Sequence, residues 1–231
     1  MRPTVPMAAG LLALAGLKVY LLRPGGPLSR WGTTGEEARE TLPGDELVPV
    51  ATSRTTRAVS VAAPPEGVWP WLVQLGQGRG GLYSYDALEN LLGLDIHSAD
   101  RVVPELQDLA VGDEVRLVPP GTEPDLTFRV TRLEPPHVLV LGPRGSRDEA
   151  FAQGLPFPVW AFVVRPGERP GTSRLLTRFT LQAPPGVLSA LAYRWALAPV
   201  HFVMERRMLL GIRERAERAG SLSGRPGTRP A

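Results

Sequence analysis

The stretch VLSALAYRWALAPVHFVMERRMLLGIRERAER, residues 187–218, decides the fold. A helix drawn from residue 199 at about 100° per residue gathers one histidine and three apolar side chains on one side: His201, Met204, Met208 and Ile212. The opposite side carries charged side chains: Arg206, Arg213 and Glu217. An amphipathic helix of this length needs a broad apolar surface to pack against. The preceding segments resemble strands, so the sequence predicts a curved antiparallel sheet packed around this helix.

The predicted strands alternate apolar and polar residues or form short apolar runs between Pro- and Gly-rich turns. They are residues 54–62, 111–118, 126–133, 138–141, 159–164 and 173–181. Two short helices follow the first strand, at residues 64–75 and 85–92, and the second ends at Gly93. The predicted class is therefore α+β, with residues 142–158 forming a long Gly-rich loop.

Composition bounds the domain organisation and excludes several functions. The chain has 231 residues, a net charge of +3 and no cysteine, which excludes disulfides, thiolate zinc sites and cysteine nucleophiles. No block of basic residues with interleaved aromatics occurs, so nucleic acid is not an expected partner. We expect an extended arm over residues 23–53, with a short helix capped by Thr33 or Thr34. The main domain spans residues 54–219, and residues 220–231 form a disordered tail.

Residues 5–22, VPMAAGLLALAGLKVYLL, contain one charged side chain, Lys18. Three interpretations remain open: a membrane anchor, which the length and composition favour, a cleaved signal peptide, and an apolar helix packed on the domain. Arginines flank the segment at Arg2, Arg23 and Arg30, and this bias favours a membrane-associated protein with a cytoplasmic domain. A soluble cytoplasmic protein or an exported one are the alternatives.

The stretch GQGRGG, residues 76–81, matches the dinucleotide fingerprint G-x-G-x-x-G. The fingerprint works between a strand and a helix of a βαβ unit, but here Pro70 precedes it in a predicted helix. We therefore predict a glycine turn that links two helices, and no dinucleotide cofactor.

The order of elements and two stretches of sequence resemble a known superfamily. The stretches are APPEGVWPWLVQLGQGRGGLYSYDALENLLGLDIHSADRVVPE, residues 63–105, and PVHFVMERRMLLGIRERAE, residues 199–217. They are similar to a bacterial branch, of unknown function, of the SRPBCC or START-like helix-grip superfamily, which includes polyketide cyclase/dehydrase-like and birch-pollen-allergen-like proteins. The resemblance covers about residues 54–219. It implies a cavity between sheet and long helix for a hydrophobic or amphipathic small molecule, and it transfers no catalytic motif.

Tyr85, Glu89 and His97 are close in sequence. A functional interpretation makes them polar contacts at the mouth of a cavity, or a general acid/base set. The favoured interpretation is that Glu89 has a structural role and that His97 lies in a solvated loop. Asp95, His97 and Asp100 would in principle hold a metal, but the histidines of this chain are scattered, so no metal site is expected.

A second group of candidates comes from the strands and the long helix. His201, Met204 and Met208 are expected to face the sheet and to line either a cavity or ordinary core. Trp160 and Phe162 share one face of their strand, and Arg178 lies on the neighbouring strand. An arginine facing a cavity would bind a carboxylate or a phosphate, but alternation does not tell which face is concave.

The sequence thus predicts a non-catalytic domain that binds a hydrophobic, lipid-like small molecule, with no cofactor and with membrane contact through residues 5–22. Two alternatives stay open. One is a polyketide cyclase/dehydratase-like enzyme that uses Tyr85, Glu89 or His97 as acid or base. The other is a structural or partner-binding module with a filled core.

Overall fold

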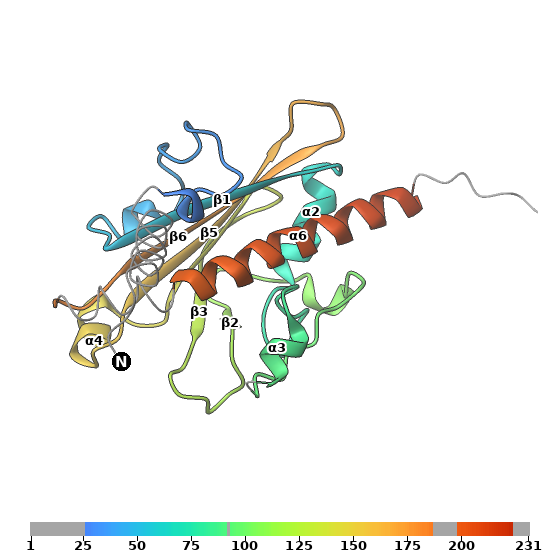
Figure 1. The fold of residues 1–231 in the computed structure, drawn as a ribbon. Helices are drawn as coiled ribbons and strands as arrows, with labels where there is room; N and C mark the ends of the chain where they lie inside the picture. Colours follow the sequence, from blue (N-terminus) through green and yellow to red (C-terminus); the bar gives the residue numbers. More distant parts are fainter. Residues whose placement is uncertain (1–25, 92, 187–197, 224–231) are drawn as a thin grey trace, which may run out of the picture.

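The computed structural model describes residues 26–91, 93–186 and 198–223, and these residues form one antiparallel sheet with helices packed on it (Figure 1). The strand order is β1-β6-β5-β4-β3-β2, and every neighbouring pair is antiparallel. The strands are β1 (Ser53–Val61), β2 (Glu114–Arg116), β3 (Thr127–Glu134), β4 (Val138–Pro143), β5 (Phe157–Pro166) and β6 (Ser173–Gln182). The longest pairings join β6 to the edge strand β1 and to β5.

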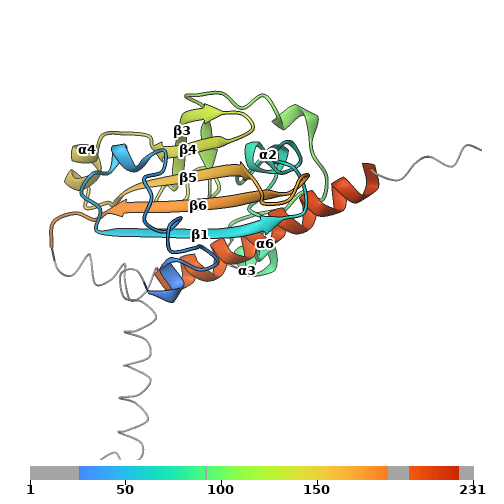
Figure 2. The ribbon, with the colours of Figure 1, turned by 90° about the horizontal axis from the view of Figure 1, so that it is seen from above.

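The long helix α6 (Ala198–Ser223) lies across one face of the sheet, as Figures 1 and 2 both show. Helix α2 (Pro65–Val73) packs beside it, and the main core fills the space between these helices and the strands. The α6 side chains in this core are Met208, Leu209, Ile212 and Ala216. The α+β helix-grip architecture predicted from the sequence is therefore confirmed.

Period-two alternation gives the sheet two buried faces. On β5, Trp160 and Phe162 belong to the core under α6, whereas Val159 and Ala161 belong to a second cluster with Val48 of the arm. A third cluster joins the arm to the same reverse face: Leu42, Ala58, Val163 and Leu176. The part of the arm around Leu42, the short helix η2 (Asp45–Leu47) and Val48 therefore covers the face of the sheet that α6 leaves open, whereas the short helix η1 (Pro27–Ser29) contacts β1 and α6.

Several elements differ from the sequence-based expectation. The predicted long loop contains a helix, α4 (Arg147–Ala152), which the capping box of Ser146 and Glu149 begins. The predicted arm helix is only a turn, in which Thr34 Oγ1 accepts a hydrogen bond from the Glu37 N–H at 3.1 Å. The remaining short helices are α3 (Asp86–Leu91) and η3 (Pro104–Leu106).

Helix α6 continues to Ser223, four residues into the segment predicted as a tail. Three predicted segments lie outside the described residues: the start of the predicted long helix at residues 187–197, the remaining tail, and the predicted anchor at residues 5–22. Among the helices that the structure describes, none combines the length and the apolar character needed to cross a bilayer.

One glycine of α6 permits a close contact. A Cβ at Gly211 would overlap the carbonyl oxygen of Tyr83 and lie 3.0 Å from the Tyr83 Cβ, whereas a Cβ at Gly220 would meet nothing within 4 Å. We expect Gly211→Ala to lower the free energy of unfolding by about 1–2 kcal/mol, because overpacking outweighs the gain in helix propensity. Gly220→Ala should be neutral or raise it by up to about 1 kcal/mol. Urea unfolding measures both, and equal effects would place the segment of Tyr83 away from α6.

Candidate functional site

A glutamate is buried beneath the first turns of α6. Glu205 is 2% exposed, and its carboxylate points at the sheet. Its Oε1 accepts hydrogen bonds from Trp160 Nε1 at 2.8 Å and from Thr177 Oγ1 at 3.0 Å, and its Oε2 accepts one from Arg57 Nη1. Strands β5, β6 and β1 thus each supply one donor, which satisfies a charge that would otherwise be very unfavourable in the interior.

Arg57, the counter-charge, is 1% exposed and comes from the α6-facing side of β1. Its Nε donates to the carbonyl oxygen of Leu28 at 3.0 Å, which connects the arm to the cluster. The guanidinium carbon lies 5.3 Å from the centre of the Phe202 ring, within the range of a cation–π contact. The buried pair Arg57–Glu205 therefore joins the arm, the sheet and the helix.

His201 lies one helical turn before Glu205, among aromatic rings. Its ring centre is 4.4 Å from that of Phe179 and 6.0 Å from that of Trp160. Both ring nitrogens are shielded from solvent, and neither has a hydrogen-bond partner in the described part of the chain. The nearest carboxylate oxygen, Glu205 Oε1, is 4.0 Å away and already accepts two hydrogen bonds. Burial, assisted by the charge of Arg57, lowers the pKa of His201 to about 3, so the imidazole is neutral.

The structure brings four of the predicted site residues to the interface of sheet and helix. Trp160 and Phe162 are buried on the α6 side of β5, Met208 is in the main core, and His201 contacts Trp160. Met204 is half-buried and turns toward the segment before α3, where its sulfur lies 3.7 Å from Ser84 Oγ.

Tyr85, Glu89 and His97 do not present their side chains to one site. Tyr85 is 39% exposed, and the His97 side chain is 78% exposed and paired with Asp95 at 3.1 Å. Glu89 is 1% exposed, and neither of its carboxylate oxygens has a partner among the described residues. Burial, with a smaller effect from the charge of Asp86, raises the pKa of Glu89 to about 7.

Arg178 lies on the reverse face of the sheet, away from α6. Its Nη1 pairs with Asp45 Oδ2 at 2.6 Å and its Nε donates to Thr56 Oγ1 at 3.0 Å. Two arm carbonyl oxygens, those of Glu37 and Glu40, accept its remaining N–H groups. This arginine therefore fixes the arm to the sheet.

Three residues of the buried cluster were missed by the sequence-based prediction: Arg57, Thr177 and Glu205. Two signals were present. Glu205 follows His201 by four residues and precedes Met208 by three, so it shares their side of the helix. Arg57 alternates in phase with Val59 and Val61, on the apolar face of its strand. A strand and a helix that pack through their apolar faces, each with one residue of opposite charge on that face, indicate a buried ion pair.

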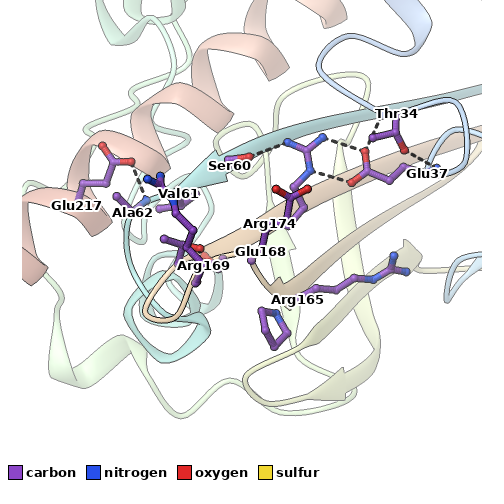
Figure 3. A pocket seen from close by; sticks show the side chains of 14 residues that line it. Thr34, Glu37, Ser60, Val61, Ala62, Arg165, Glu168, Arg169, Arg174 and Glu217 are labelled. Atoms are coloured by element: carbon purple, nitrogen blue, oxygen red, sulfur yellow. Dashed lines mark hydrogen bonds and ion pairs between the residues drawn. The ribbon is translucent and has the colours of Figure 1, made fainter.

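A groove of about 590 Å³ lies at the other end of the sheet, between the arm, the hairpin of β5 and β6, and the last turns of α6 (Figure 3). Two of its charged side chains, Arg174 and Glu37, are paired with each other. Arg174 contacts both oxygens of Glu37 at 2.8 Å, and Glu217 accepts the N–H of Ala62 at 2.9 Å. This polar, solvent-open groove does not have the character of the predicted apolar cavity.

No cluster of three or more histidine, aspartate or glutamate side chains suited to a metal occurs among residues 26–91, 93–186 and 198–223. The GQGRGG stretch is a turn between α2 and α3, closed by paired hydrogen bonds between Gly76 and Gly81. It does not follow a strand, as a dinucleotide-binding turn would.

No known protein-family profile matches the sequence, and no curated protein matches it. Several solved structures are similar to the chain in fold. A truncated norcoclaurine synthase from Thalictrum flavum is 12% identical, over 68% of this chain and 92% of that chain, with a TM-score of 0.41. A protein from Nitrosomonas europaea is 11% identical, over 74% and 98%, with a TM-score of 0.44. A hypothetical protein from Helicobacter pylori is 14% identical, over 80% and 98%, with a TM-score of 0.43. Function therefore has to be argued from the site itself.

Proposed function

We propose that the domain binds a hydrophobic or amphipathic small molecule between the sheet and the N-terminal half of α6, without chemistry. The observation that carries this proposal is the His201 ring, whose two nitrogens are buried among aromatic rings without a partner in the described residues. An unsatisfied buried polar atom costs about 1–3 kcal/mol. A ligand that offers a hydrogen bond there would recover that cost.

The start and the middle of α6 differ in how they pack, which supports this location. Met208, Leu209 and Ile212, in the middle of the helix, are at most 2% exposed. Before Glu205, His201 and Phe202 are only half-buried, and Val203 is 46% exposed. A surface of aromatic rings with few polar groups is typical of a small-molecule site.

Native mass spectrometry of the protein purified from its own host tests the proposal. We expect an additional lipid-like mass on the folded protein that is lost on denaturation, and saturable binding of a fluorescent fatty-acid probe to the stripped protein. Absence of both the mass and the probe binding would contradict the proposal. That result would favour the alternative of a structural or partner-binding module with a filled interior.

A cyclase/dehydratase-like enzyme is the second candidate, and one observation favours it. Glu89 is a buried carboxyl whose pKa is raised to about 7, so a substantial fraction carries a proton at neutral pH and could donate it. Tyr85 and His97, by contrast, are exposed. A bound mass that is chemically altered by the wild type but not by Glu89→Gln would support the enzyme over the binder.

We also propose that residues 5–22 anchor the domain in a membrane, as their length and single charge suggest. We expect the full-length protein to sediment with membranes and to require detergent for release, whereas a chain that starts after Arg30 stays in the supernatant. Cell fractionation with immunodetection measures both. Full-length protein in the supernatant without detergent would contradict the anchor.

A further inference from the structure

The polar groups around His201 form a site without net charge. Arg57 and Glu205 neutralise each other, and both are at most 2% exposed. The Glu205 carboxylate already accepts hydrogen bonds from Arg57, Trp160 and Thr177, and Arg57 also donates to Leu28. A charged ligand group would therefore find no unengaged counter-ion in this pair.

His201 itself adds no charge, because its pKa lies far below neutrality. A neutral imidazole has one N–H donor and one bare nitrogen acceptor. Among the described residues, the charged side chains that face the ring are Glu205, on its own helix, and Arg57, on β1. The rings of Trp160 and Phe179 also lie against it. The ring therefore offers hydrogen bonds in surroundings that do not stabilise either sign of charge.

Resting on the function proposed above, we propose that His201 selects ligands with an uncharged polar head, a hydroxyl or a carbonyl group, over ligands that end in a carboxylate or an ammonium. A hydroxyl both donates and accepts, which matches the two ring nitrogens. A carboxylate would lie next to the carboxylate of Glu205, and an ammonium would approach Arg57. Either charged head group would lose its hydration without gaining a free counter-charge, and this loss weakens binding at a buried site.

Three probes of equal chain length separate the outcomes: decanol, decanoate and decylammonium, each used at neutral pH to displace an uncharged apolar fluorophore. We expect decanol to displace it with an affinity at least about tenfold higher than either charged probe, the value of about one hydrogen bond. If the fluorophore binds but decanoate or decylammonium competes as well as decanol, the head-group inference is wrong and the binding function stands. If neither the fluorophore nor any of the three binds, the proposed function fails, and the inference with it.

Variants show whether His201 makes the selection. His201→Phe keeps an aromatic ring at this position without ring nitrogens, so the preference for decanol should disappear. His201→Gln keeps an uncharged donor and acceptor, so it should retain the preference. His97→Phe removes an exposed histidine and serves as the matched control, with the wild-type preference expected. Thermal melting checks that each variant is folded. Should His201→Phe not fold, loss of the preference in a folded His201→Gln would overturn the inference, and so would a preference that persists in a folded His201→Phe.

Discussion

Replacing Glu205 by alanine should lower the free energy of unfolding by about 3–5 kcal/mol, the largest effect that we expect from a single change outside the apolar core. The substitution leaves the Arg57 guanidinium buried without its counter-charge. It also removes the acceptor of Thr177 Oγ1 and one of the two acceptors of Trp160 Nε1, which keeps Thr177 Oγ1 at 2.8 Å. Urea unfolding followed by tryptophan fluorescence measures the change, and Trp160 itself lies at the site.

An exposed pair on the same helix is the matched control. Arg207 and Glu214 are 3.0 Å apart, but their side chains are 31% and 44% exposed. Glu214→Ala should therefore cost less than about 1 kcal/mol. Equal costs for Glu205→Ala and Glu214→Ala would mean that water reaches the Arg57–Glu205 pair.

A double variant separates two contributions to the free energy of unfolding: the net stabilisation by the ion pair, and the cost of leaving one charge buried without its partner. Arg57→Met with Glu205→Leu replaces both charges by apolar side chains of similar volume, and such replacements are often close to neutral. We expect the double variant to be more stable than Glu205→Ala. A double variant that is as unstable as the sum of the two single changes would show that the two side chains are not coupled, and the unpaired charge would then not explain the cost of Glu205→Ala.

The fold was predictable because strand alternation and helical periodicity report burial, and burial fixes the packing of layers. The ion pair was harder to predict, because its partners are 148 residues apart in sequence and belong to a strand and a helix. Each partner alone looks like one polar residue on an apolar face. Only the register of β1 against β6, which pairs Arg57 with Thr177, brings them under the same turn of α6.

The orientation of Arg178 could not be predicted for a related reason. Alternation assigns Arg178 to the face opposite Thr177, but it does not tell which face α6 covers. The arm decides the outcome, because Asp45 and the carbonyl oxygens of the arm provide the partners for the guanidinium. The arm itself contains turns and short 3-10 helices, which have no periodic signal in the sequence.

The burial of Glu89 could not be predicted from the amphipathic pattern of its helix, since α3 exposes Leu88 and Leu91 and buries the glutamate. Helices of this length contribute little stability of their own, so tertiary contacts decide which side faces inward. The Glu89 carboxyl, which has no partner among the described residues, is therefore a site where the fold tolerates an unfavourable group.

Glu89→Gln should stabilise the protein in a pH-dependent manner. The carboxyl has an ordinary pKa of 4.5, and burial raises the pKa to about 7 in the folded protein. Below pH 4.5, Glu89 carries its proton in both the folded and the unfolded state, so it does not lower the free energy of unfolding. As the pH rises through the folded pKa, the native state must bury an unpartnered carboxylate, and stability is lost. Glutamine has nearly the same shape and no charge, so this loss should disappear in the variant.

The expected gain is about 2–3 kcal/mol at about pH 8 and close to zero below about pH 4.5. Urea unfolding of both proteins across this pH range measures the gain. The difference between their free energies of unfolding should grow as the pH rises from the lower pKa to the higher one. Glu105→Gln, which changes an exposed glutamate, should leave the pH profile of the wild type unaltered. A constant gap at all pH values would show that Glu89 keeps the same charge in both states. Its carboxylate would then have a partner, and the argument for Glu89 as a protonated acid would lose its basis.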